Sequence, residues 1–487
     1  MQRKIDLPRL TRFFWALVVL FLPVTSFRFF PFLGRDTMVR PLAYYPLAIL
    51  AILLLIRLFR REIKPKWNVS VFLLLVFVGI SIATSVIGAA MDPIPMHGQN
   101  FLGRDLRAWA TMLGGLVFFF CALTMNRSED DLKFTVKFLL AGVLISAIWG
   151  AIQACMYFLD FPPKPILNQI QLSFSIRKLL VKPRVAGFAY EPSWLANQIA
   201  TIYLPWILGI TLAGFQVLKR RWIAFIGLGL TVGLLLVTFS RGGILIAAGS
   251  TLIVLLITRL DWIKNIFIWL VRPVSNTNTS IDRLRLIGIR TGVIVVFLSL
   301  LAALGVTLAQ NKYFAQIWRS NKTNLIEYAV DVYAGPRLAY AEAAWHIFEA
   351  HPWTGVGMGA SGLTLYDHLP EWSLTTLSEI TRQLTPEGTL YPNPKNLFLR
   401  VLAETGWIGF GVYLVFILTI LLQLIRMKGN GSPYRNALQM GGLLTWFAVF
   451  FFNFTQDSWI DPNAWFGFAI ICGILVNETG TSKRSDQ

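Results

Sequence analysis

The chain has little of what a soluble or metal-dependent enzyme of its size contains. Only 14% of its 487 residues are charged, and it holds four histidines and three cysteines. The cysteines, Cys121, Cys155 and Cys472, fall within apolar runs, so they are expected to be small buried side chains rather than disulfide partners. No spacing typical of metal ligands occurs, and we expect neither a metal nor another cofactor.

Long apolar runs make up much of the chain. Hydrophobic residues make up 55% of the chain and the mean hydropathy is +0.59, which is too apolar for a soluble protein. Since a membrane-spanning helix needs about 20 apolar residues, the runs predict about twelve transmembrane helices. The expected fold is therefore an all-α polytopic membrane protein. The predicted spans are residues 13–32, 42–56, 69–89, 108–125, 134–158, 194–215, 222–238, 243–257, 292–308, 398–425, 438–452 and 464–476.

The formal charge of +19 follows the expected topology. If the amino terminus is cytoplasmic and the spans alternate in direction, the segments on the inner side collect most of the basic excess. This is the positive-inside pattern, and it predicts that both termini are cytoplasmic. The basic excess thus indicates contact with anionic membrane lipids and excludes the need for a nucleic-acid partner.

One long hydrophilic stretch, residues 310–396, interrupts the apolar pattern and is expected to face outward, into the periplasm. It divides the chain into spans 1–9 (residues 1–309), this extracytoplasmic loop with short helices (310–396), and spans 10–12 with a cytoplasmic tail (397–487). The loop holds eight aromatic residues that could stack on sugar rings, but we expect most of them to form a small core. These residues are Trp318, Tyr328, Tyr333, Trp345, Trp353, Tyr366, Trp372 and Tyr391.

Basic side chains recur on the predicted outer side, where the positive-inside tendency disfavours them. Arg184 lies in the loop before the sixth span, and Arg241 lies in a tight turn between the seventh and eighth spans. An arginine at the membrane surface normally has an anionic partner or faces a wet cavity. Arg337 begins a helical pattern within the long loop, and Lys395 sits where that loop meets the membrane.

Two further outer residues are expected to begin helices. Glu191 precedes Pro192 and Ser193, which together make a helix start before the sixth span. Asn396 can cap the tenth span, because asparagine accepts hydrogen bonds from the free amides of a first helical turn.

Taken together, Arg184, Arg241, Arg337 and Lys395 predict a diphosphate site. The planar guanidinium fork binds phosphate oxygens in pairs. A diphosphate at the outer leaflet implies a polyprenyl-linked glycan donor, and the predicted chemistry is transfer of its sugar to an acceptor hydroxyl. The arginines, Arg241 among them, would stabilise charge on the leaving diphosphate.

The order of these motifs resembles the O-antigen ligase and polymerase superfamily. Ser240-Arg241-Gly242 is followed by a long outer loop with Arg337 and His351-Pro352-Trp353-Thr354-Gly355-Val356-Gly357, then by Asn396-Leu397-Phe398-Leu399 and Glu404-Thr405-Gly406. The resemblance covers roughly residues 184–409. It implies a metal-independent, inverting membrane glycosyltransferase of O-antigen, exopolysaccharide or capsule synthesis, in which Arg241, Arg337 and Asn396 contact the donor.

The chain departs from the family at one position. Members usually carry a histidine, proposed to activate the acceptor hydroxyl, directly before the asparagine that matches Asn396, and this chain has Lys395 there. A lysine acts as a base only where its surroundings lower its pKa. Lys395 is therefore expected either in that role or as another diphosphate contact, with the base at Glu191, Glu404 or His351 or not needed.

The substitution favours a polymerase, because the histidine is most closely tied to ligases. The alternatives are a ligase that attaches polymer to a lipid or protein acceptor, a transporter of lipid-linked oligosaccharides, and a non-enzymatic scaffold. The expected partners are the polyprenyl-diphosphate-linked glycan, a glycan or lipid acceptor, membrane lipids and other polysaccharide-assembly proteins. A transporter of this kind should show paired interrupted helices or an internal repeat. No repeat at a fixed period is found, and the large one-sided loop argues against a transporter.

Overall fold

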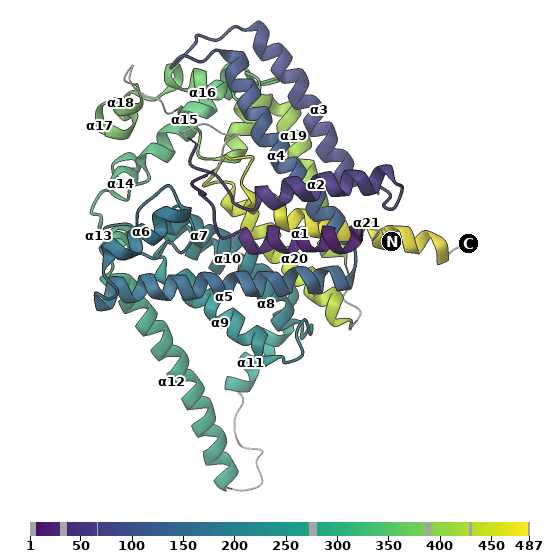
Figure 1. The fold of residues 1–487 in the computed structure, drawn as a ribbon. Coiled ribbons are helices and arrows are strands. Elements are labelled where there is room, and N and C mark those ends of the chain that lie inside the picture. Colours follow the sequence, from purple (N-terminus) through teal and green to yellow (C-terminus); the bar gives the residue numbers. More distant parts are fainter. Residues whose placement is uncertain are drawn as a thin grey trace.

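The computed structural model describes residues 6–29, 37–65, 67–271, 280–384, 391–427 and 431–485 (Figure 1). Throughout these ranges the regular structure is helical, with three isolated β-bridges and no named strand. The all-α prediction is therefore confirmed for the described residues.

Six helical segments in the described ranges are long and apolar enough to cross a membrane. They are α3 (Val69–Ala90), α4 (Phe101–Met125), α5 (Glu129–Leu159), the segment Pro192–Leu212, α10 (Arg241–Thr258) and α19 (Leu397–Arg426). Shorter apolar helices are α2 (Tyr44–Phe59), α9 (Trp222–Val237) and the first part of α21 (Pro462–Ser485). The chain is thus an integral membrane protein, and the count of twelve spans stays a prediction.

The segment Pro192–Leu212 contains a π-helical turn. It consists of α7 (Pro192–Gln198), five π-helical residues (Ile199–Tyr203) and α8 (Leu204–Leu212). Small residues then let α8 approach α20 (Pro433–Phe452) closely, because a Cβ on Gly209 would lie 2.8 Å from the backbone nitrogen of Gly441. Backbone approach of this kind is how membrane helices gain packing without a hydrophobic driving force between them.

The first predicted span, residues 13–32, is wrong as a single helix. The helix α1 (Leu7–Phe21) has 15 residues and ends two positions before Pro23. Proline lacks an amide hydrogen and crowds the preceding turn, so the helix stops there although the apolar run continues. Residues 30–32 of the predicted span lie outside the described residues.

The hydrophilic stretch forms a group of short helices between α12 (Ser280–Gln310) and α19. They are α13 (Lys312–Arg319), α14 (Leu325–Asp331), α15 (Gly335–Ala350), α16 (Ser361–Thr364), α17 (Glu371–Thr376) and α18 (Ser378–Leu384), while residues 385–390 lie outside the described residues. In Figure 1, α13, α14, α17 and α18 lie on the left, and the start of α1 and the end of α21 lie on the right. The loop helices and the chain ends are therefore at opposite ends of the bundle.

The core beneath these loop helices is mostly aliphatic. Ala343, Ala344 and Ile347 of α15 pack in one cluster with Ala403 of α19. The same two helices also meet through the rings of Phe348 and Trp407, whose centroids are 5.3 Å apart. Half of the eight loop aromatics are exposed, which corrects the expectation that most would form a core: Trp318 (53%), Tyr333 (61%), Trp345 (43%) and Trp353 (68%).

The glycine-rich loop after α15 is bonded to the backbone of α19. Amides of Val356 and Gly357 donate to the carbonyl oxygens of Ala403 (2.9 Å) and Glu404 (3.0 Å). The helix α19 is kinked at Gly406, where φ is +61°. A Cβ at Gly406 would lie 2.3 Å from the carbonyl of Trp353, so only glycine fits. The loop at residues 355–359 and the kink at Gly406, far apart in sequence, are thus the two halves of one backbone contact, called the glycine seam below.

Candidate functional site

Arg184 is held against the turn that carries Arg241. The Nε of Arg184 donates to the carbonyl oxygen of Thr238 at 3.0 Å, and the next amide, that of Val185, donates to Val237 at 3.1 Å. The loop before α7 therefore lies along the turn between α9 and α10. Thr238, which Arg184 contacts, lies three residues before Arg241, the first residue of α10.

Gln153 of α5 fixes this loop from inside the bundle. Its fully buried Oε1 accepts the amides of Ala186 (3.1 Å) and Gly187 (2.9 Å), and its Nε2 donates to the carbonyl of Gly187 (2.9 Å). Gly187 has φ of +57°, a conformation that favours glycine. Gln153 thus fixes the backbone of the loop that carries Arg184.

Arg241 reaches from the first turn of α10 to the long loop. Ser240 caps α10, and a terminal nitrogen of Arg241 donates to the carbonyl oxygen of Val332 at 2.8 Å. Arg337, which is exposed, lies five residues further along the chain in the first turn of α15. A third contact joins the same segments, because the ammonium of Lys182 lies 5.7 Å from the ring centroid of Tyr333.

The structure therefore brings together the segments that carry the three arginines that the sequence singled out. Arg184, Arg241 and Arg337, called the arginine cluster below, come from three separate segments that meet through Thr238 and Val332. Three guanidinium groups on converging segments can bind a polyanion bidentately.

Lys395 contacts α15 at Tyr340, one helical turn after Arg337. Its ammonium is 5.1 Å from the ring centroid of Tyr340, and Tyr340 follows Arg337 by three residues, a spacing that makes neighbours on a helix. The ammonium also donates to Oε1 of Glu379 in α18 at 2.7 Å. The backbone of Lys395 is left-handed, with φ of +51°, and its amide donates to Asp457 Oδ2 at 3.1 Å.

Asn396 caps α19, as the sequence predicts. Its Oδ1 accepts the amides of Phe398 (3.0 Å) and Leu399 (3.2 Å). The side-chain oxygen is committed to the helix, so a contact with substrate would use the amide nitrogen.

The other predicted acid–base candidates lie in separate surroundings. Glu191 precedes α7, where Arg177 (3.0 Å) and the Ser193 hydroxyl (2.5 Å) bind its two oxygens. His351 ends α15, about 21 Å along the helix axis from Arg337. Glu404 is 1% exposed within α19 and accepts from Arg400 (3.1 Å) and Ser361 (2.7 Å). Each carboxylate thus already has donors of its own.

Several residues of this region were not predicted from the sequence. Glu379, Asp457 and Tyr340 surround Lys395, yet none lies in a motif, and they meet it only through the fold. Gln153 could have been found, since a lone amide within an apolar span indicates a specific partner.

Burial raises the pKa of the Tyr340 phenol well above its usual value, with smaller contributions from Glu379 and Tyr366. The phenol therefore stays neutral and donates to Gln383 Oε1 at 2.5 Å. The ammonium of Lys395 lies over the face of the Tyr340 ring.

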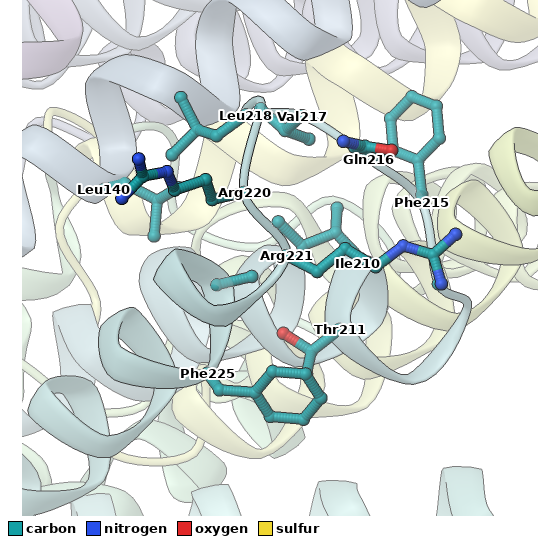
Figure 2. A pocket seen from close by; sticks show the side chains of 12 residues that line it. Leu140, Ile210, Thr211, Phe215, Gln216, Val217, Leu218, Arg220, Arg221 and Phe225 are labelled. Atoms are coloured by element: carbon teal, nitrogen blue, oxygen red, sulfur yellow. The ribbon is translucent and has the colours of Figure 1, made fainter.

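A cavity of about 130 Å³ lies at the other end of α9 from Arg241. Leu140 of α5, the end of α8 and the loop before α9 line it, with Arg220 and Arg221 at its edge (Figure 2). Since α9 has 16 residues, about 24 Å of helix separates this cavity from the arginine cluster. Among the residues that the structure describes, no group of three or more His, Cys, Asp or Glu side chains could hold a metal ion.

Comparison with known protein families gives a match over part of the chain. Residues 226–414 match the family described as O-Antigen ligase. The match includes Arg241, Arg337, Lys395 and both halves of the glycine seam, whereas Arg184 lies outside it. No curated protein matches the chain closely enough to suggest a particular relative. Over residues 226–414, the chain thus carries an O-antigen ligase domain, which supports its place in the O-antigen ligase-like superfamily.

Proposed function

We propose that the protein is a glycosyltransferase that polymerises glycan from a polyprenyl-diphosphate-linked donor on the outer face of the cytoplasmic membrane. The observation that carries this proposal is the joining of Arg184, Arg241 and Arg337 through Thr238 and Val332. Its partners would be the lipid-linked donor, a glycan or lipid acceptor, and other polysaccharide-assembly proteins.

In the proposed reaction the arginine cluster binds the donor diphosphate. The acceptor hydroxyl attacks C1 of the donor sugar from the side opposite the diphosphate, so the configuration at C1 inverts. The bond from C1 to the diphosphate oxygen breaks, the diphosphate keeps the electron pair, and the proton of the acceptor hydroxyl passes to the leaving diphosphate or to water. Arginines already in place stabilise that charge without reorganising during the reaction.

Lys395 is assigned as a charged contact in this scheme, because its ammonium donates to Glu379 and lies over the ring of Tyr340, one turn of α15 after Arg337. A fixed positive charge at this place would extend the arginine cluster along α15. Reaction without metal and with inversion is the expectation that goes with the family.

The choice of polymerase over ligase depends on Lys395. The ligases of the superfamily are the members most closely tied to a histidine at this position. The alternative, a ligase that attaches polymer to a lipid or protein acceptor, is favoured by the description of the matching family.

The decisive experiment measures glycan length in cells that carry Arg241→Ala or Arg337→Ala. Each variant should collapse the polymer distribution. Arg319→Ala, an exposed arginine of α13, is the matched control and should leave it unchanged. A wild-type distribution in normally expressed Arg241→Ala cells would refute an enzymatic role.

A deletion strain separates the two enzymes. Single capped repeat units are expected when the gene is removed, since a polymerase is then missing. Long polymer stranded on the polyprenyl carrier would instead identify a ligase.

A further inference from the structure

A second group of basic residues lies at the start of α4. Arg104 and Arg107 are in its first two turns, and the guanidinium of Arg104 lies 4.2 Å from the ring centroid of Tyr391. The first turn of α16 covers it, because a Cβ on Gly362 would lie 2.7 Å from a terminal nitrogen of Arg104. Packing on an aromatic ring and a glycine therefore holds this guanidinium.

Three buried polar atoms around Arg104 have no hydrogen-bond partner among the described residues. They are Nε of Arg104, Oε2 of Glu404 and the hydroxyl of Tyr366. Each costs about 1–3 kcal/mol when buried without a partner. Such atoms in a native protein indicate a missing water, ion or ligand.

The unpartnered atoms belong to one electrostatic group. Arg400, Glu404, Tyr391 and Arg107 all act on the charge of Arg104, and Tyr366 interacts with Tyr391. Glu404 accepts from Arg400 and Ser361 through Oε1 only, which leaves Oε2 to accept from something else. The neighbouring Asp105 is engaged elsewhere, since it accepts from Ser85 at 2.7 Å.

The chemistry of this group fits a sugar that bears a phosphate. The guanidinium groups of Arg400 and Arg107 and the carboxylate of Glu404 all act on Arg104, so positive groups outnumber negative ones in this group. Burial raises the pKa of Tyr366 to about 12, with Tyr391 adding to the effect, so its hydroxyl remains a donor. Oε2 of Glu404 is an acceptor that suits a sugar hydroxyl. Together these atoms supply donors for phosphate oxygens and one acceptor beside them.

A chain of contacts connects the group to Lys395. A terminal nitrogen of Arg400 donates to the carbonyl oxygen of Asp457 at 2.7 Å, and the carboxylate of Asp457 accepts the amide of Lys395. The group thus connects to the backbone of Lys395, whereas Tyr340 of α15 contacts its side chain.

We propose that Arg104, Arg400, Glu404 and Tyr366 form the acceptor subsite, which binds the phosphate-bearing sugar whose hydroxyl receives the transferred glycan. This inference rests on the proposed function, because it supplies the second substrate of that reaction. The donor diphosphate would occupy the arginine cluster, with Lys395 between the two sites.

The test uses calorimetry to measure the binding of glucose 1-phosphate to the purified full-length protein in phosphatidylcholine nanodiscs. Two sites are expected. Arg104→Gln should weaken one by about tenfold or more, because a charge-assisted pair of hydrogen bonds is lost, and Arg241→Gln should weaken only the other. Neutral glucose should compete at neither.

The two proposals fail in different ways. A single site that Arg241→Gln abolishes and Arg104→Gln leaves intact would overturn the acceptor subsite. Two sites as expected, together with normal glycan length in Arg241→Ala cells, would refute the proposed function and leave the subsite standing. If Arg104→Gln does not fold, Tyr366→Phe removes a single hydroxyl, and unchanged affinity in that variant would overturn the inference.

Discs that also contain undecaprenyl phosphate distinguish the source of the ligand. Weaker binding of glucose 1-phosphate at the Arg104-dependent site in these discs would identify a lipid-linked acceptor. Equal binding in both kinds of disc would identify a water-soluble one.

Discussion

The ammonium of Lys395 lies 2.7 Å from Oε1 of Glu379, and both side chains keep part of their surface in solvent, 33% and 46% respectively. A half-exposed ion pair of this kind contributes about 0–1 kcal/mol to stability. The pair is therefore better suited to holding a charge in place than to stabilising the fold.

This relationship predicts how Lys395 responds to substitution. Lys395→Arg keeps the positive charge and should retain most of the polymer-forming activity, whereas Lys395→Met should lose about tenfold or more. Glycan length and turnover in membranes are the measurements, with the thermal midpoint showing that both variants fold. An arginine variant as inactive as the methionine variant would instead assign proton transfer to Lys395.

Asn396 gives a second prediction, because its oxygen serves two amides of α19. Asn396→Ala should destabilise the protein by about 0.5–2 kcal/mol, and Asn396→Asp should restore stability since aspartate caps equally well. Thermal unfolding in detergent measures both. If Asn396→Asp is stable but loses glycan synthesis, the amide nitrogen has a role in substrate binding beyond the cap.

The glycine seam predicts a contrast within one helix. Gly406→Ala should lower stability by about 1–3 kcal/mol, since a strained φ and a clash with Trp353 combine. Gly411→Ala, five residues along α19, is the control because a Cβ there meets nothing within 4 Å. It should be neutral or stabilising by up to about 1 kcal/mol. Equal thermal midpoints for the two variants would contradict the seam.

These sites show which features the sequence could predict. The helix α9 spans Trp222–Val237, within one residue of its predicted end, because apolar runs and flanking basic residues are local signals. The contact of Arg184 with the turn that carries Arg241 was also predictable, since both arginines lie at the predicted outer ends of spans. The partners Glu379 and Asp457 were not, because they meet Lys395 across 16 and 62 residues of chain without a local pattern.

Stability should depend on pH through Asp461. Burial raises the pKa of Asp461 from 3.8 to about 6, although an amide hydrogen bond from Asn463 opposes the shift. The folded state therefore holds this proton more tightly than the unfolded chain. The resulting stability is fully present below pH 3.8 and is lost as the pH rises through 6.

Asp461→Asn cannot ionise and keeps the side-chain oxygen that accepts from Asn463. We expect its thermal midpoint at pH 8 to exceed that of the wild type by roughly 1–3 °C, and the difference to vanish towards pH 4. Asp367→Asn, at an exposed loop carboxylate, is the control and should show little change at either pH. A constant difference across this range would rule out ionisation of Asp461 as the cause.

The length of α19 couples the site to the lipid around it. The kink at Gly406 divides α19 into a first part that follows Asn396 and a second part, residues 407–426, of about 30 Å, which is about the thickness of the hydrocarbon core of a bilayer. The part that carries Asn396 therefore projects beyond the hydrocarbon while the rest of the same helix is anchored in it. A thinner or thicker bilayer would tilt α19 to a different angle. Lys395 would then shift relative to Arg241, which stands on another helix, so acyl-chain length becomes a determinant of how well donor and acceptor are aligned.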